Sequence, residues 1–118
     1  MSYRFSQREH LRSEGDFRRL FQEGARAEGE WMILYCLASS QQKKRLGVSC
    51  QRHAFRTHVL RNRAKRRLRE CFRLCKDHLA AGFDLVLVAK KSIGKEPEFK
   101  RLMEEFLCLA KREGMLKV

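Results

Sequence analysis

Blocks of helical and of strand-like periodicity follow one another along this sequence. Near the N-terminus, apolar residues recur at helical spacing behind a Ser-x-x-Asp pair that resembles a capping box. This pattern predicts a short helix over residues 13–23, ended by Gly24. Residues 31–38 form an unbroken apolar run of strand length, and residues 45–50 alternate apolar with small or polar positions. We expect these two strands to pair as an antiparallel hairpin.

The second half of the chain predicts a helix, a strand and a helix. Across residues 57–79, the apolar side chains fall within an arc of about 120°, and most basic side chains take the rest of the helix circumference. These apolar residues are Leu60, Ala64, Leu68, Cys71, Phe72, Cys75 and Leu79. Arg61 falls inside the arc, so either the first turn is irregular or Arg61 reaches around the helix end. Residues 83–89 predict a buried strand, and a last helix is expected from Pro97, in its first turn, to Gly114.

This succession of elements predicts a small α/β sandwich in a single domain, with helices packed on a mixed sheet. The strand–helix–strand unit across 45–89 implies a parallel strand pair, and a chain of 118 residues supports one domain. No apolar run approaches the length of about 18 residues that spans a membrane, and the first residues lack the apolar core of a signal peptide. We therefore expect a cytoplasmic protein without a membrane partner. The five cysteines, an odd number, are expected to be reduced thiols.

Basic residues are concentrated in one third of the chain. The protein has 27 Lys and Arg against 14 Asp and Glu, a net charge of +13. Residues 43–76 hold 13 of the basic residues and a single acid, Glu70, and so carry +12 of this charge. Solvated helix faces usually mix both signs of charge for pairing, which this segment does not. The segment therefore favours a polyanionic partner, nucleic acid above all.

Two sets of residues could bind nucleic acid. Residues 61–70 place guanidinium groups on one broad helix face, where they can grip phosphate oxygens. A basic helix can also bind an anionic membrane, but here the apolar face is needed for the core. Phe17 and Phe21 share a helix face near Tyr35 of the adjoining strand, so the three rings either stack on unpaired bases or belong to an ordinary core.

Metal binding and protein-borne catalysis find little support. Cys71, Cys75 and His78 share a helix face at a spacing that suits zinc, but the same face is the apolar seam and no fourth ligand is evident. The four histidines form no acid–base set, and the acidic residues are scattered. We expect neither a metal site nor a catalytic residue in the protein.

Four stretches of the sequence match one known family. They are Gly15-Asp16-Phe17-x-x-Leu20-Phe21-x-x-Gly24, Arg45-Leu-Gly-Val-Ser-Cys-Gln-Arg-His, Arg61-Asn62-Arg63-x-Lys65-Arg66-x-Leu68-Arg69-Glu70-x-Phe72-Arg73 and Phe83-Asp84-Leu-Val-Leu-Val-Ala. Over about residues 9–110, the chain resembles the protein subunits of bacterial ribonuclease P. The resemblance implies the order α-β-β-β-α-β-α, with about four strands in a mixed sheet and three helices. It also implies a short strand near Ala25–Glu28, a left-handed crossover through the basic helix and a short N-terminal extension over about residues 1–10.

The resemblance implies a function beside a catalytic RNA. The RNA hydrolyses one phosphodiester of precursor tRNA with Mg²⁺ that it mainly binds itself, and so removes the 5′ leader. The protein, one per RNA, would bind both the ribonuclease P RNA and the leader, assisting leader removal and broadening the substrate range. The alternatives are a structural ribosomal or other RNA-packaging protein without a role in catalysis, or a nuclease that acts alone.

The residues of the family's two binding surfaces carry over by position. The resemblance places the leader on Phe17, Phe21 and Tyr35. It places the RNA subunit on Arg45, Arg52, His53, Arg61, Asn62, Arg63, Lys65, Arg66, Arg69 and Arg73. The sequence departs from the family pattern in three places. His53 replaces a firmly cationic residue, Arg67 stands where an apolar residue is common, and Thr57-His58 is not the commonest sequence before the Arg-Asn-Arg motif.

Overall fold

The computed structural model describes residues 10–11, 13–40 and 43–117. The α-helices and strands follow the order α-β-β-β-α-β-α, with short 3₁₀ helices after α2 and after β4. The elements are α1 (Glu14–Glu23), β1 (Ala25–Glu28), β2 (Met32–Ala38), β3 (Lys44–Cys50), α2 (His58–Cys75), η2 (Lys76–His78), β4 (Phe83–Ala89), η3 (Lys91–Lys95) and α3 (Phe99–Arg112). The expected helices and strands are confirmed, including the short strand β1 that the family resemblance implied.

The four strands form one mixed sheet in the order β1-β2-β4-β3. β4 lies between β2, to which it is antiparallel, and β3, to which it is parallel. The expected hairpin of residues 31–38 with residues 45–50 is therefore wrong. The hairpin does not form because β4 enters between the two strands. β4 is buried from Asp84 to Ala89, as expected for a central strand that is paired on both edges. β2 forms its hairpin with β1 instead, in a register that places Arg26 opposite Tyr35.

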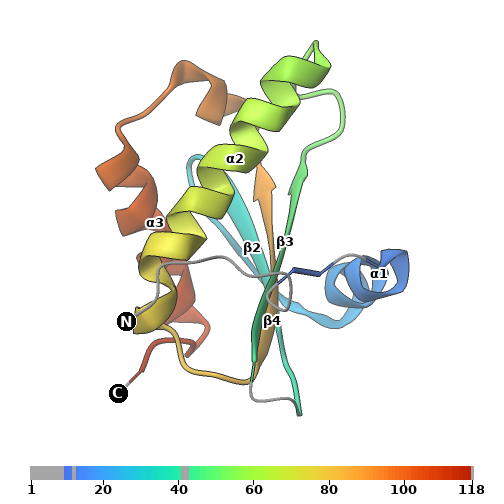
Figure 1. The fold of residues 1–118 in the computed structure, drawn as a ribbon, viewed down its shortest axis with the longest axis vertical. Coiled ribbons are helices and arrows are strands. Elements are labelled where there is room, and N and C mark those ends of the chain that lie inside the picture. Colours follow the sequence, from blue (N-terminus) through green and yellow to red (C-terminus); the bar gives the residue numbers. More distant parts are fainter. Residues whose placement is uncertain (1–9, 12, 41–42, 118) are drawn as a thin grey trace.

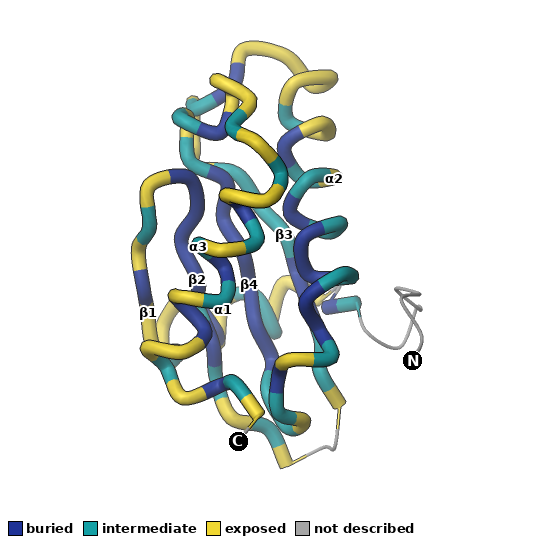
Figure 2. Tube along the Cα trace, turned by 90° about the vertical axis from the view of Figure 1, so that its left-hand side faces the viewer, coloured by how far each residue is buried: buried dark blue, intermediate teal, exposed yellow. Residues whose placement is uncertain are grey.

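The parallel pair β3 and β4 is joined through α2 by a left-handed crossover. Figure 2 views the sheet from the side that α2 covers, with β3 to the right of β4. Both strands run upward in Figure 1, so the chain passes from β3 through α2 to a strand on its left. This is the sense that the resemblance implied, against the usual right-handed rule.

The sheet separates two unequal layers. α2 and α3 cover one face, and α1 covers part of the other (Figure 1). The larger core packs the buried faces of α2 and α3, with Phe72 and Phe106 at its centre, against inward residues of all four strands. The smaller core on the α1 side consists of Leu11, Leu20, Ile33, Val86 and Val88, with partly buried side chains around it. β4 is buried from Asp84 to Ala89, and β2 is buried over its first three residues and at Cys36 (Figure 2).

Both edges of the sheet leave few unpaired backbone N–H and C=O groups for another strand. β1, at one edge, has only four residues, and two of them are the charged Arg26 and Glu28. At the other edge, the segment before α1 runs beside β3, and the backbone N–H of Leu11 donates to the carbonyl of Leu46 at 2.9 Å. The chain thus covers part of the β3 edge with its own backbone.

Helix α2 is shorter and more exposed at its start than the sequence indicates. It is N-capped by the Thr57 side chain, which accepts from the Leu60 N–H at 3.2 Å, and α-helical geometry gives way to η2 after Cys75. Leu60 is 43% exposed and lies outside the core, whereas the other apolar positions of the expected arc are buried. Arg61 reaches around the helix end, because its Nη1 donates to the Phe55 carbonyl at 3.3 Å.

The capping residues of the other two helices match their sequences, except at the start of α3. At the start of α1, the Ser13 Oγ accepts from the Asp16 N–H at 3.0 Å, as in a capping box. α3 begins after its N-cap Glu98, so Pro97 precedes the helix rather than lying in its first turn. Gly114 follows the helix with a φ of 69°, in the left-handed region that glycine adopts without strain.

Candidate nucleic-acid interface

The three aromatic residues of the predicted leader site meet where α1 packs on the sheet. The ring centroids of Phe17 and Phe21 are 6.3 Å apart, and the Tyr35 ring lies 4.9 Å from Phe21 in an edge-on arrangement. Phe21 is 43% exposed, and Phe17 and Tyr35 are half-buried. Phe17 and Phe21 line an open groove of about 790 Å³ together with Ser49 of β3 and Lys65 of α2. We call this the aromatic groove.

Gly47 of β3 shapes the floor of the aromatic groove. A Cβ added at Gly47 would lie 2.4 Å from the Cζ of Phe17, far inside van der Waals contact. Only glycine therefore lets the Phe17 ring rest directly on the strand. The glycine of the Arg45-to-Cys50 run is explained by this close approach.

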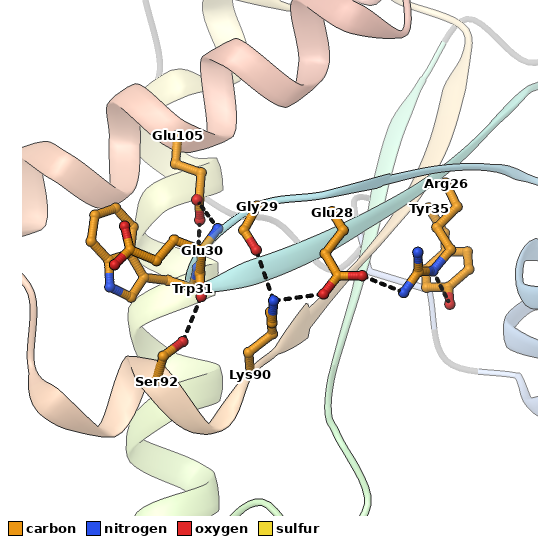
Figure 3. Close-up of polar contacts among 9 residues, drawn as sticks. All are labelled: Arg26, Glu28, Gly29, Glu30, Trp31, Tyr35, Lys90, Ser92 and Glu105. Atoms are coloured by element: carbon orange, nitrogen blue, oxygen red, sulfur yellow. Dashed lines mark hydrogen bonds and ion pairs between the residues drawn. The ribbon is translucent and has the colours of Figure 1, made fainter.

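A chain of polar contacts holds Tyr35 from the side of β1 (Figure 3). The Nε of Arg26 donates to the Tyr35 hydroxyl at 3.2 Å, and its Nη2 donates to Glu28 at 2.7 Å. Lys90, just after β4, donates to the other Glu28 oxygen at 2.6 Å and to the Gly29 carbonyl at 2.9 Å. The hydrogen bond from Lys90, and then that from Arg26, hold the pKa of the Glu28 carboxyl below its usual range. Tyr35 is thereby fixed beside a guanidinium group.

The exposed face of α2 carries the basic side chains that remain open to a partner. In the part of the chain that the structure describes, the side chains of six predicted RNA-binding residues make no hydrogen bond or ion pair. They are Arg52, His53, Asn62, Lys65, Arg66 and Arg69. The four on α2 fall within an arc of about 100° at 100° per residue. A continuous cationic strip therefore runs along the helix, and Lys65 joins it to the aromatic groove.

Arg45 is engaged inside the protein. Its Nε and Nη2 donate to the two oxygens of Asp84 at 2.9 and 2.8 Å, and Asp84 is only 1% exposed. The Nη2 of Arg19 donates to the same carboxylate at 3.2 Å. Hydrogen bonding to Asp84 raises the pKa of the Arg45 guanidinium. A buried carboxylate requires such pairing, so Arg45 has the least freedom of the predicted RNA-binding residues.

Three other predicted RNA-binding residues also have partners within the chain. Arg63 forms an ion pair with Glu96, and Arg73 forms one with Glu70. Arg61 donates to the Phe55 carbonyl, as described above. The Arg63 side chain is nevertheless 64% exposed and can bind a phosphate without leaving its place on the surface.

Arg52 and His53 lie in the exposed connection between β3 and α2. His53 has a φ of 65°, an uncommon value for a residue with a side chain. Both residues come shortly after β3, the strand that contributes Ser49 to the aromatic groove. The predicted RNA-binding residues therefore extend along the molecule, from Arg52 and His53 in this connection to Arg73 in the last turn of α2.

Sequence reasoning missed two basic residues beside the predicted leader-binding rings, Arg18 and Arg26. Arg18 lines the groove beside Phe17 and Phe21, and Arg26 holds Tyr35. The helical spacing of Arg18 was available as a signal. No signal in the sequence pointed to Arg26, because its position beside Tyr35 depends on the pairing register of the four-residue strand β1.

The candidate zinc ligands do not come together. Cys71 and Cys75 are fully buried and hydrogen-bond to each other, whereas His78 is exposed. The bond to Cys75, together with burial, raises the pKa of the Cys71 thiol. Across residues 10–11, 13–40 and 43–117, no group of three or more His, Cys, Asp or Glu is placed to hold a metal ion. The five cysteines are unpaired, as expected, although Cys108 is exposed.

A basic helix face joined to an aromatic groove, on a small α/β sandwich, defines a nucleic-acid-binding protein. Among the described residues, no helix has the length and apolar character needed to cross a membrane.

Comparison with known proteins identifies the family. The family model described as Ribonuclease P matches residues 5–114. A ribonuclease P protein component of Thermotoga petrophila is 34% identical over 115 residues, covering 95% of this chain and 97% of that protein. One of Coxiella burnetii is 37% identical over 94 residues, covering 80% and 76%. The solved ribonuclease P protein of Thermotoga maritima superposes with a TM-score of 0.76 at 32% identity, covering 88% and 96%. The chain belongs to the ribonuclease P protein family.

Proposed function

We propose that this chain, as a ribonuclease P protein component, binds two RNAs at once. The cationic strip of α2 binds the phosphate backbone of the catalytic RNA, and the aromatic groove binds the single-stranded 5′ leader of precursor tRNA. The protein supplies binding and positioning, while the RNA carries the hydrolysis of the phosphodiester. Its place of action is the cytoplasm, with one protein for each RNA.

The arrangement of the groove suits a single strand. Phe21 is 43% exposed and lines the groove, and the half-buried Tyr35 ring lies beside it, so unpaired bases of any sequence can stack at this place. Arg18, Arg26 and Lys65 stand around these rings at positions suited to phosphates. A duplex offers no unstacked base to such rings, so the groove favours leader over paired tRNA.

The proposal assigns the magnesium ions to the RNA. The described residues offer no set of three acidic or imidazole ligands. Bound Mg²⁺ would activate the attacking water and stabilise the leaving oxygen. The part of this protein is to raise the affinity for the leader-bearing substrate.

The position of Lys65 between the two binding surfaces is the observation that supports the proposal best. It lines the aromatic groove with Phe17 and Phe21, and on α2 it lies beside Asn62, Arg66 and Arg69 of the cationic strip. One rigid helix therefore holds the leader site at a fixed position relative to the catalytic RNA.

Reconstitution with ribonuclease P RNA tests the cationic strip. Changing Lys65, Arg66 and Arg69 together to Ala should weaken RNA binding and reduce the magnitude of the negative slope of log K against log salt by about 0.7–0.9 for each phosphate that the variant no longer neutralises. The matched control changes three exposed basic residues of α3, Lys100, Lys111 and Arg112, and removes the same charge. Equal slopes in the two variants would contradict the proposal.

Leader removal at low magnesium tests the function itself. We expect the wild-type protein to accelerate cleavage of precursor tRNA by ribonuclease P RNA. Cleavage by the protein alone would instead favour an independent nuclease, and stable association with ribosomes without any effect on tRNA ends would favour a structural RNA-packaging protein.

A further inference from the structure

A second hollow lies on the opposite side of α2 from the aromatic groove. It has a volume of about 400 Å³ and lies between the β3–α2 connection, the first turns of α2 and η3. Pockets of about 300–1,000 Å³ are typical of small-ligand sites. Phe55, Leu60 and Ile93 supply apolar walls, and Arg63 and Arg67 are among its basic residues. We call it the α2–η3 pocket.

Leu60 explains why this hollow is apolar. It is 43% exposed although it belongs to the apolar arc of α2. At 100° per residue, Leu60 lies on the same side of the helix as Ala64 and Arg67, away from Arg66 and Arg69. An exposed leucine therefore forms one wall of the α2–η3 pocket instead of packing in the core.

Arg67 brings an unsatisfied donor to the pocket. Its Nη2 donates to the Pro97 carbonyl, but its Nη1 is buried and has no partner among the described residues. A buried N–H of a cation without an acceptor is destabilising, and most such groups in proteins are hydrogen-bonded. Arg67 also lines the pocket, so a small rotation of its guanidinium group would bring this covered donor to an acceptor atom of an occupant.

Charge around the pocket favours an anion. Its lining holds four Lys and Arg residues and one acid, which are Arg56, Arg63, Arg67, Lys91 and Glu96. Glu96 is already paired with Arg63. Arg56 and Lys91 are exposed at the surface and are free to contact a phosphate. The complementary ligand combines a flat apolar group with a negative charge.

Two uncommon backbone conformations meet at the same place. His53 and Glu96 have φ values of 65° and 54°, and they are the two non-glycine residues with positive φ in the described chain. Both line the α2–η3 pocket. Left-handed backbone in residues with a side chain is strained, and it occurs preferentially at ligand clamps and functional sites.

We propose that the α2–η3 pocket binds one unstacked nucleotide of the ribonuclease P RNA. The base lies against Phe55, Leu60 and Ile93, and Nη1 of Arg67 donates to an acceptor on the base edge. Its phosphate lies at Arg56 and Lys91. This inference rests on the proposed function, and it commits to the RNA subunit because the leader site lies across α2 from the pocket.

Affinity for the full-length RNA, measured over a series of salt concentrations, tests the inference. Leu60→Ala should weaken binding roughly fivefold to a hundredfold, because it removes apolar side-chain area that the base would bury. The salt slope should not change, since the leucine side chain carries no charge. Val59→Ala is the matched control, because Val59 is 75% exposed on the same turn and does not line the pocket.

Arg67→Met keeps the aliphatic stem and removes the donors. If Leu60 and Arg67 hold the same base, the reductions in affinity from Leu60→Ala and Arg67→Met should be less than multiplicative in the double variant. Equal affinities of Leu60→Ala and Val59→Ala would overturn the inference, as would fully multiplicative reductions. A Leu60→Ala effect confined to leader-bearing substrate would also overturn it, because the occupant would then be the leader.

The failure of this inference can be told from failure of the proposed function. If the wild-type protein does not bind ribonuclease P RNA, the proposed function fails. If the wild-type protein binds and the Lys65, Arg66 and Arg69 variant shows the expected change of salt slope, the proposed function stands. The affinities of the Leu60→Ala and Arg67→Met variants then decide whether the pocket binds a nucleotide.

Discussion

The two faces of the sheet use the same strands for different purposes. Because side chains alternate along a strand, Leu34 and Leu87 face α2 and α3, whereas Tyr35 and Val86 face α1. The first face is covered by two amphipathic helices and closed into a continuous core. The second is covered by a single ten-residue helix, and rings remain exposed beside it.

This difference separates stability from binding. The sheet face under α2 and α3 stabilises the fold, and its strand side chains do not reach a partner. A face that is half covered keeps aromatic surface available. Of its polar positions, Ser49 lines the groove, whereas Arg45 and Asp84 form ion pairs that tie α1 to the sheet. Substitutions on the two faces should therefore affect different measurements.

Truncation on the helix-covered face should have the largest effect on stability. Phe106 is fully buried in the larger core, so Phe106→Ala is expected to destabilise the protein by about 3–5 kcal/mol. Urea unfolding followed by circular dichroism measures this change. If Phe106→Ala lowered leader affinity in a protein of unchanged stability, the division between the two faces would be wrong.

Arg45 tests whether the polar residues of the α1 face act within the protein. Arg45→Ala leaves the buried Asp84 with Arg19 as its remaining partner, and we expect a loss of unfolding free energy of about 3 kcal/mol, at the lower end of the range for a broken buried pair. The unfolding midpoint measures this loss. A normal midpoint combined with weakened RNA binding would instead assign Arg45 to the RNA interface.

Truncation in the aromatic groove should change binding more than stability. Phe21 is 43% exposed, and Phe21→Ala should weaken binding of leader-bearing precursor tRNA by about 1–3 kcal/mol if a base stacks on the ring. Mature tRNA, which lacks the leader, is the control substrate, and Gln22→Ala is the control variant in the same groove. The same loss of affinity for both substrates would argue against a leader site.

Thiol reactivity should give the smallest and simplest contrast. Burial on the helix-covered face raises the pKa of the Cys36 thiol to about 11, so it holds almost no thiolate at pH 8. Cys108 is exposed. Native protein treated with Ellman's reagent at pH 8 should release colour rapidly from Cys108, with Cys36 reacting after unfolding or as the pH approaches its pKa. A Cys108→Ser variant identifies the fast thiol, and rapid reaction of Cys36 in the folded state would show that this face opens.

Periodicity predicted the elements of this chain better than their pairing. The apolar run of β2 and the helical spacing of α3 each define a structure by themselves. The partner of β2 depends on β4, which arrives more than forty residues later in the sequence and enters between β2 and β3. Residues adjacent in sequence favour a hairpin, and only the two-sided burial of β4 overrides that preference.

The candidate sites divide in the same way. Phe17, Phe21 and the basic run of α2 were predictable, since each follows from the spacing of residue types on one helix. Arg26 depends on the register of β1, and the pocket at Arg67 depends on η3 and on two left-handed residues. Such features arise from the packing of distant segments and leave no periodic trace.

The short N-terminal segment beside β3 has a consequence for self-association. An exposed strand edge is a template on which a second sheet can grow, and β3, the outer strand, presents one. The backbone of Leu11 occupies part of that edge, while the opposite edge strand is brief and charged. A molecule built this way resists joining with its own copies through backbone pairing, even where a bound polyanion neutralises the repulsion between its positive charges.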